Sequence, residues 1–295
     1  MSTTEKREPR LYAAAEALAE VDALDGVADA IASKIRDLAG GTAFKNALTG
    51  SWLGHPLHPV LTDVAIGTWT SATLLDWVGG RASEPAARRL LGIGVTAAVP
   101  TILSGWMDYI DSIYGNPQVK RVGIVHAFAN ATATTLFGTS LAARRNGAIG
   151  RGKALALAGV AVTTVSAYLG GHLSFGNAVG VDQTAFEDPE SDWTDVLATG
   201  ELGERTPRYV EAHGIGVLVV REGGELFALS DRCSHRGGPL HEGKLEDGCV
   251  VCPLHGSTFR LRDGSLVRGP SPYPQPLWEA RERAGRVEVR PAGQQ

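Results

Sequence analysis

Two short Cys-His motifs near the C-terminus constrain this chain more than any other feature of its sequence. The first motif is C-x-H and contains Cys233 and His235, and the second is C-x-x-H and contains Cys252 and His255, with sixteen residues between the motifs. Thiolate sulfur and imidazole nitrogen are ligands that proteins offer to iron and zinc. Because each motif supplies one ligand of each kind, the spacing predicts a metal centre held between two loops.

The residues around these motifs have the pattern of a small all-β domain. After Trp193 the chain consists of short β-rich runs separated by turn signals such as Gly223-Gly224, Asp247-Gly248 and Asp263-Gly264. A polar and acidic stretch, residues 176–192, precedes this region and is typical of a tether. We therefore expect residues 193–295 to form a separate domain whose strands hold the two motif loops rigidly.

The motifs and their β-rich context resemble the Rieske [2Fe-2S] family over roughly residues 193–291. A Rieske centre has two thiolates on one iron and two imidazoles on the other. The resemblance therefore implies a 2Fe-2S cluster whose ligands are Cys233, His235, Cys252 and His255. Ser257 stands where the family places a hydroxyl donor to a cluster sulfur, and Gly269-Pro270-Ser271-Pro272 resembles the proline-containing loop that covers the cluster.

Three positions depart from the respiratory branch of that family. Rieske proteins of cytochrome bc complexes carry an extra, disulfide-bonded Cys in each loop and a Tyr donor, whereas this chain has Gly238, Leu254 and Phe259 in those places. Because hydrogen bonds to the sulfurs raise the potential, we expect a reduction potential in the lower half of the ~−150 to +300 mV Rieske range. The loops resemble those of the Rieske ferredoxins of bacterial oxygenase systems. The chain itself is not expected to be an oxygenase, since no His for a second iron site follows His255.

A zinc site is the alternative interpretation of the same residues. Cys249 and Cys252 form a C-x-x-C pair that could join Cys233 and one His in a Cys₃His site. The motif spacing favours the iron-sulfur centre. Cys249 is then expected to be a strand residue that packs as a small apolar group.

Four apolar runs in the middle of the chain predict a membrane domain. The runs are Val60–Val78, Leu90–Met107, Val122–Ala143 and a stretch from Ala154 that meets no charged residue before Asp182. A helix needs about 20 mostly apolar residues to span a bilayer, and the recurring Gly and Ala residues allow close helix packing. The alternative is a soluble bundle of very apolar helices. We expect a multidomain membrane protein in which a four-helix transmembrane bundle, residues 51–175, precedes the all-β domain.

The flanking segments complete this organisation. Residues 1–50 have the spacing of amphipathic helices, and their charged beginning lacks the apolar core of a signal peptide. From Leu48 to about Val181 the chain resembles a bacterial membrane family catalogued as domain of unknown function 2231, which implies no catalytic residues.

Basic residues give the expected orientation in the membrane. The two connections inside the apolar region carry Arg81, Arg88, Arg89, Arg144, Arg145, Arg151 and Lys153, whereas the opposite side has Lys45, Lys120 and Arg121. The positive-inside rule then places both termini outside. This expectation conflicts with the resemblance, because Rieske domains without the disulfide are usually cytoplasmic.

Four histidines are expected at one end of the membrane bundle. His55 and His58 precede the first run, His126 lies near the start of the third, and His172 lies at the end of the fourth. Ionisable groups within membrane segments are candidate functional sites, so these side chains are a candidate haem b, metal or quinol site. The alternative is that they are solvated residues at helix ends.

These observations favour a membrane-anchored electron-transfer protein, a component of an oxidoreductase system. It would pass single electrons between a membrane donor, quinol or haem, and a redox partner protein. A redox-sensing or scaffold protein whose cluster has no turnover role is the alternative. The lipid bilayer is an expected partner, and nucleic acid is not, because the chain has no strong basic excess.

Overall fold

The computed structural model describes residues 9–39, 42–113 and 116–293, which form two compact units. The helical unit comprises Met1–Gly40 and Leu57–Val179, and the β unit comprises Gly41–Pro56 and Gly180–Gln295. Residues 1–8, in which the sequence predicts no signal peptide, lie outside the described residues. The chain therefore contributes to the β unit twice, because residues 41–56 belong with its C-terminal part.

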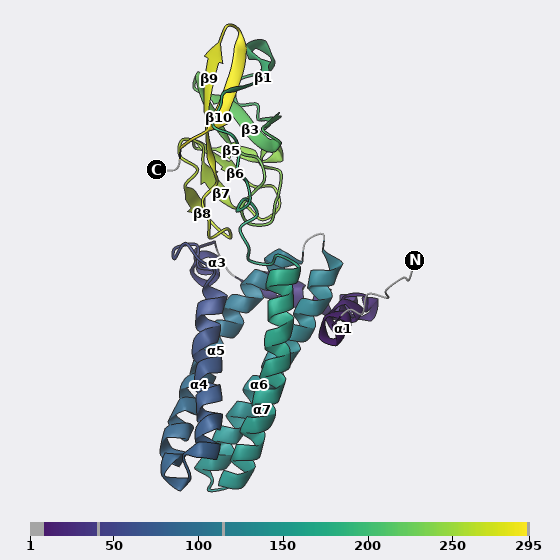
Figure 1. The fold of residues 1–295 in the computed structure, drawn as a ribbon, viewed down its shortest axis with the longest axis vertical. Helices are drawn as coiled ribbons and strands as arrows, with labels where there is room; N and C mark the ends of the chain where they lie inside the picture. The colour runs from purple at the N-terminus through teal and green to yellow at the C-terminus, as the bar shows by residue number, and fades with distance from the viewer. Residues whose placement is uncertain (1–8, 40–41, 114–115, 294–295) are drawn as a thin grey trace, which may run out of the picture. The chain divides into compact units, whose positions relative to one another are not determined.

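Long helices dominate the helical unit (Figure 1). Its described elements are α1 (Arg10–Ala19), η1 (Asp22–Leu24), α2 (Asp25–Leu38), α4 (Leu57–Val78), η2 (Arg81–Ser83), α5 (Glu84–Ser112), α6 (Pro117–Arg145), α7 (Ile149–Gly171) and the π-helical turn η3 (His172–Gly176). α4 packs mainly on α5, and α6 packs mainly on α7, so that the unit contains two helical hairpins. Pro85 and Pro117 lie in the first turns of α5 and α6, where a missing backbone N–H costs no hydrogen bond.

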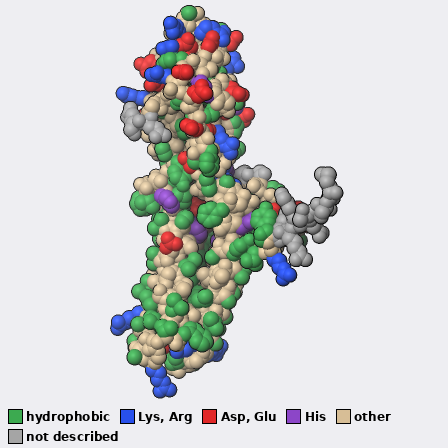
Figure 2. Space-filling view, viewed as in Figure 1, with side chains coloured by type: hydrophobic (Ala, Val, Ile, Leu, Met, Phe, Trp, Pro, Cys, Tyr) green, Lys and Arg blue, Asp and Glu red, His purple; other side chains and the backbone are tan. Residues whose placement is uncertain are grey.

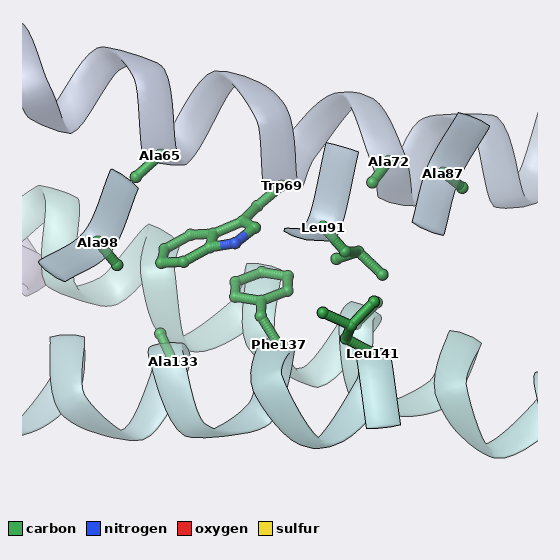
Figure 3. Close-up of a cluster of buried hydrophobic side chains, with 10 residues drawn as sticks. Ala65, Trp69, Ala72, Ala87, Leu91, Ala98, Ala133, Phe137 and Leu141 are labelled. Carbon is green, nitrogen blue, oxygen red and sulfur yellow. The ribbon is translucent and has the colours of Figure 1, made fainter. Parts of the chain in front are cut away.

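The interior between the long helices is built from small side chains around one aromatic pair. Figure 3 shows Trp69 of α4 lying flat against Phe137 of α6, with ring centroids 4.4 Å apart. The other buried side chains of this cluster are mostly alanines, namely Ala65, Ala72, Ala87, Leu91, Ala98, Ala133, Leu141 and Ala156. Ser104, Ser140 and Ser166 are buried as well. Small side chains of this kind let helix backbones approach one another closely.

Large apolar side chains cover the outside of the same helices. Exposed examples are Trp77 on α4, Ile93 on α5, Phe128 on α6 and Val165 on α7, and Figure 2 shows apolar side chains along the visible face of the helical part. Among the described residues, two helical segments are long and apolar enough to cross a membrane, Arg81–Ser112 and Ile149–Gly176. An apolar exterior around an interior of small, partly polar side chains is typical of helices that pack together in lipid.

One end of the helical unit contains a buried ion pair. The guanidinium of Arg144 in α6 contacts both carboxylate oxygens of Asp76 in α4, and its Nη1 also lies 2.7 Å from the Glu84 carboxylate. Arg144 and Asp76 are almost completely buried. Removing one partner of such a pair would leave an uncompensated buried charge, which is strongly destabilising.

The N-terminal helices pack against α6 through charge pairs. Arg121 makes two hydrogen bonds to the Asp25 carboxylate, at 2.9 and 3.0 Å, and Lys120 lies 3.1 Å from Asp29. Ala15 and Ala19 of α1 pack with Val119 of α6 in a buried apolar cluster. The amphipathic pattern of residues 11–39 thus reflects one face turned toward α6.

The β unit consists of two antiparallel sheets and the short helix α3 (Thr42–Thr49). The six-stranded sheet has the order β1-β10-β9-β4-β3-β2, and the four-stranded sheet has the order β5-β6-β7-β8. The strands are β1 (Thr194–Ala198), β2 (Arg208–Ala212), β3 (Ile215–Glu222), β4 (Glu225–Ser230), β5 (Lys244–Glu246), β6 (Cys249–Val251), β7 (Thr258–Arg260), β8 (Leu266–Arg268), β9 (Leu277–Arg283) and β10 (Arg286–Pro291). Short 3₁₀ turns, η4 (Thr199–Glu201) and η5 (Leu240–Glu242), interrupt the loops. A buried apolar cluster that includes Leu218, Leu229, Val250 and Phe259 joins the two sheets.

The expected order of a helical region followed by an all-β domain is confirmed. The segment 41–50, which the sequence assigned to the N-terminal helical region, is part of the β unit in the structure. Asn46 of this segment lies beside Gly269, more than 200 positions away in the sequence, and no local pattern predicts that proximity.

Candidate functional site

The two Cys-His motifs form the same turn twice. The Cys233 carbonyl accepts a hydrogen bond from the Gly237 N–H at 2.8 Å, and the Cys233 N–H donates to the Gly238 carbonyl at 2.9 Å. In the second loop the Cys252 carbonyl accepts from the Gly256 N–H at 3.1 Å, and the Cys252 N–H donates to the Ser257 carbonyl at 2.8 Å. Gly237 and Gly256 both have positive φ, 70° and 77°, a conformation that favours glycine.

These matching turns bring the four motif side chains into two pairs. The thiols of Cys233 and Cys252 are buried and share a hydrogen bond. The rings of His235 and His255 meet edge to face, with centroids 5.0 Å apart. Each loop contributes one member to each pair, as the sequence spacing requires.

The surroundings favour the protonation states that metal ligands need. Burial lowers the pKa of His235 well below its usual value and lowers that of His255 to about 4, with help from the nearby charges of Lys45 and Arg236. Both imidazoles are therefore neutral at pH 7. The hydrogen bond from Cys233 lowers the pKa of the Cys252 thiol to about 7, and the same bond raises the pKa of Cys233. The thiol pair can thus release a proton near neutral pH, as thiolate ligation requires.

The donor set fits a dinuclear cluster that takes two ligands on each iron. Nδ1 of His235 is buried and has no hydrogen-bond partner among the described residues, although buried polar atoms are normally paired. A cluster with two irons needs this pairwise arrangement, with thiolates at one side and imidazoles at the other.

The residue that would complete a zinc site lies elsewhere. The Cys249 thiol contacts the Asp247 carbonyl at 3.7 Å, and the buried cluster that contains Cys233 and Cys252 does not include it. This position agrees with the expectation that Cys249 is a strand residue.

A network of hydrogen bonds fixes the two loops beneath the site. Ser257 is fully buried, and its Oγ accepts the N–H of Ser271 at 2.9 Å, so its own hydroxyl proton can be donated to another group. Gln275 accepts the N–H of Ser234 at 3.0 Å and donates to the carbonyls of Ser230 and Arg232, both at 2.7 Å. Sequence reasoning identified Ser257 but missed Gln275, whose position after the proline-rich loop was the only signal available.

The positions that depart from the respiratory pattern are neighbours in space. A Cβ atom at Gly238 would lie 2.9 Å from both Cys252 Sγ and Leu254 Cγ. Gly238 is therefore in close contact with one member of the Cys pair and with the side chain of the other loop. Phe259 is completely buried in the apolar cluster that also contains Cys233 and Cys252, and its side chain carries no hydroxyl.

The segment 41–56 packs beside this site within the β unit. A Cβ atom at Gly269, in the proline-containing loop, would overlap Oγ of Ser51 and lie 3.1 Å from Oδ1 of Asn46. The positive charge of Lys45 in α3 acts on both His235 and His255. The cluster loops thus have a basic neighbour from the distant N-terminal part of the sequence.

The four histidines expected at one face have different surroundings. His55 belongs to the β unit and is exposed. His172 is buried, lies 3.2 Å from the Glu16 carboxylate and packs edge-on against Tyr12. His58 and His126 lie in α4 and α6, and Nδ1 of each bonds a backbone carbonyl of the next helix, that of Thr101 at 2.9 Å and that of Ser166 at 2.8 Å. Only these last two share a common environment.

Comparisons with known proteins match the helical part and the β part of the chain to two different families. Residues 192–279 match the Rieske [2Fe-2S] domain family, and residues 54–183 match the family described as Predicted membrane protein (DUF2231). The anthranilate 1,2-dioxygenase ferredoxin subunit of Burkholderia cepacia is 38% identical over 99 residues, 34% of this chain and 92% of that protein. Ferredoxin CarAc of Metapseudomonas resinovorans is 32% identical over 98 residues, 33% of this chain and 92% of that protein.

Among solved structures, this chain is similar over part of its length to the ferredoxin of carbazole 1,9a-dioxygenase from Nocardioides aromaticivorans IC177. It has 27% sequence identity and a TM-score of 0.33, and the match covers 35% of this chain and 100% of that chain.

Proposed function

Because the chain belongs to the Rieske [2Fe-2S] domain family through residues 192–279, we propose that it is a membrane-anchored one-electron carrier. Its Rieske part is homologous to the ferredoxin subunits of dioxygenases. The carrier would take electrons from a donor in the membrane and pass them to a redox partner protein. The relatives' names suggest a ferredoxin-dependent oxygenase system as one setting for that partner.

The pairing of the four motif side chains carries this proposal. Cys233 and Cys252 would hold one iron, and His235 and His255 would hold the other through nitrogens such as the buried, unbonded Nδ1 of His235. A bound 2Fe-2S cluster accepts and releases one electron at a time. The two half-buried imidazoles are the part of the site through which a partner could exchange that electron. Ser257 would donate its hydroxyl to a cluster sulfur, since its Oγ already accepts the Ser271 N–H.

The distribution of apolar side chains supports a membrane anchor of four spanning helices. Two helical segments, Arg81–Ser112 and Ile149–Gly176, are long and apolar enough to cross a membrane. α4 and α6 contain more polar residues, yet they too carry large exposed apolar side chains, Trp77 and Phe128. The most polar group of the bundle, Arg144, is neutralised inside it by Asp76 and Glu84. A span that hides its charges in this way can lie in lipid without exposing them.

The basic residues support an orientation with both termini outside. Arg81, Arg88, Arg89, Arg145 and Arg151 belong to the connections at one end of the helical unit, and Figure 2 shows basic side chains at the lower end of that part. Arg144 adds little to this asymmetry because its charge is paired and buried. Labelling of a C-terminal tag in intact cells tests the orientation, and labelling only after permeabilisation would contradict it.

Membrane fractionation tests the central proposal. After an alkaline carbonate wash, the dithionite-reduced membrane fraction should retain the EPR signal of a Rieske cluster. An EPR signal that leaves with the wash would contradict a membrane-anchored carrier.

A further inference from the structure

Several covalent connections join the β unit to the helical unit. The chain passes between the units at Gly40–Gly41, Pro56–Leu57 and Val179–Gly180. The first two connections bound the segment 41–56, and α4 begins directly after that segment at Leu57. Residues of this segment are therefore held close to the start of a proposed spanning helix by the chain itself.

The segment 41–56 turns polar side chains toward the β unit. Asn46 and Ser51 lie beside Gly269, where both have an atom within 3.1 Å of the position of a Cβ atom. Thr49 is only 3% exposed, and its Oγ1 lies 3.2 Å from Oγ of Ser51. Hydroxyl and amide groups thus form the side of the segment that packs on the protein.

The large apolar side chains of the same segment point the other way. Phe44, Trp52 and Leu53 are 49%, 68% and 43% exposed. Phe44 and Ala47 are neighbours on the surface of α3, being three residues apart, and the Trp52 indole N–H donates to the Ala47 carbonyl at 3.0 Å. The two aromatic side chains therefore lie at the same helical turn. A segment with polar side chains inward and apolar ones outward is the reverse of one that faces water.

The remaining connection, Val179–Gly180, also has exposed aromatic side chains on both sides. Phe175 precedes it and is 91% exposed, and Phe186 follows it and is 94% exposed. These are the highest values for large apolar side chains in the described parts of the chain. Exposed aromatic side chains thus lie near every connection, as is typical of segments that lie in a membrane interface.

We propose that Phe44, Trp52 and Leu53 insert into the headgroup region of the lipid bilayer and anchor the β unit at the membrane surface. Trp52 precedes Leu57 by five positions, and five extended residues span at most about 18 Å. The headgroup region is about 5–8 Å thick on each side of the hydrocarbon core, so it lies within reach of the segment. This inference rests on the proposed function, since it requires α4 to span the membrane.

An anchored segment would keep the cluster loops near the bilayer. The loop Gly269-Pro270-Ser271-Pro272, which resembles the loop that covers a Rieske cluster, is the part of the β unit that Asn46 and Ser51 contact. A donor confined to the membrane could then reach the cluster without a large movement of the β unit. The anchor thus provides a physical basis for electron exchange at the membrane surface.

Fluorescence quenching of the full-length, cluster-loaded protein in nanodiscs tests the proposal. An NBD label is attached to Trp52→Cys or to Leu53→Cys, and the unlabelled background is measured on the wild type, whose three cysteines are buried. Brominated acyl chains should quench both labels, and aqueous iodide should quench them several-fold less than a label at Gly200→Cys. Gly200 is a matched control in the β unit, because it is exposed and nothing lies within 4 Å of a Cβ there.

EPR of oriented membrane multilayers tests whether these residues anchor the cluster. The Rieske signal of the wild type should change with the angle between the magnetic field and the membrane normal. The variant Phe44→Ser/Trp52→Ser/Leu53→Ser should keep the intensity of the signal and lose most of its angular dependence. Tyr209→Ser, which alters an exposed aromatic residue on the edge strand β2, should keep both.

Three results would overturn the anchor. These are iodide quenching at residues 52 and 53 as strong as at residue 200, labels shielded from both quenchers, as contact with a second copy of the chain would produce, and unchanged angular dependence in the triple variant. Each leaves the proposed function standing when carbonate-washed membranes retain the Rieske EPR signal. Loss of that signal from washed wild-type membranes would instead contradict the proposed function, and the anchor with it.

Discussion

The imidazole rings of His235 and His255 meet edge to face at a centroid distance of 5.0 Å and an interplanar angle of 88°. They come from loops that leave different strands, β4 and β6, and each follows a buried cysteine at the same kind of turn. This relationship separates a nitrogen pair from a sulfur pair, which is the arrangement that a Rieske 2Fe-2S cluster requires.

Removing the Ser257 hydroxyl should lower the reduction potential of the cluster. A hydrogen bond to a cluster sulfur stabilises the reduced, more negative form. Losing about 1 kcal/mol of that stabilisation corresponds to a decrease of about 40 mV for one electron. Redox titration of Ser257→Ala measures the effect. Thr258→Val is the control, since the Thr258 hydroxyl bonds the Gly256 carbonyl, and an equal shift in both variants would contradict the assigned role.

Adding a methyl group at Gly238 should reduce cluster loading. The new Cβ would lie 2.9 Å from Cys252 Sγ, so the proposed ligand or the loop must move. Iron and acid-labile sulfide per protein should therefore fall in Gly238→Ala. Gly200→Ala is a matched control in the same unit, because nothing lies within 4 Å of a Cβ there. Full loading of Gly238→Ala would show that this close contact does not restrict the site.

Removing the charge of Lys45 should also lower the potential. Lys45 acts electrostatically on both proposed His ligands, and a positive charge favours the more negative, reduced cluster. The expected decrease for Lys45→Gln is on the order of 20 mV, the Coulomb energy of unit charges about 10 Å apart in water. The decrease should shrink at high salt. Lys244→Gln, an exposed position on β5, is the control, and identical potentials for Lys45→Gln and the wild type would contradict this contribution.

Breaking the buried ion pair should destabilise the helical unit strongly. Arg144→Met leaves the Asp76 carboxylate buried without its partner, which typically costs about 3–5 kcal/mol. The double variant Asp76→Leu/Arg144→Met should recover much of that loss. Thermal unfolding in detergent measures both variants, with Arg145→Met at an exposed neighbouring position as the control. An Arg144→Met protein as stable as the control would show that the pair is dispensable.

The sequence predicted the chemistry of the site better than its surroundings. The pairing of Cys233 with Cys252 and of His235 with His255 is the one that the Rieske resemblance implies, and the motifs that carry the resemblance are local in the sequence. The support from Gln275 and the neighbouring charge of Lys45 depend on tertiary contacts that no local pattern records. Residues 176–192, which the sequence predicts to be a polar tether, divide between the units at Val179 and Gly180, and the Gln183 N–H donates to the Ser234 carbonyl at 3.0 Å within the β unit.

The hairpins α4–α5 and α6–α7 form an internal repeat, with α6 residues 68 positions after their α4 counterparts, and hydropathy did not reveal it for a related reason. Its two halves share identical residues at only a few interior positions, such as His58 and His126 or Gly94 and Gly159. Elsewhere equivalence means a shared contact, as between Trp69 and Phe137, and not a shared residue type. Hydropathy detects the helices but cannot detect this pairing.

The ligand set is tested most directly by pulsed EPR of the reduced, detergent-purified protein. Electron spin echo modulation should show couplings from two histidine nitrogens, which change when histidine alone is labelled with ¹⁵N. His255→Ala should abolish the two-histidine pattern, whereas His241→Ala should preserve it. A wild-type spectrum without histidine couplings, or purified protein that carries zinc instead of iron and sulfide, would contradict the account.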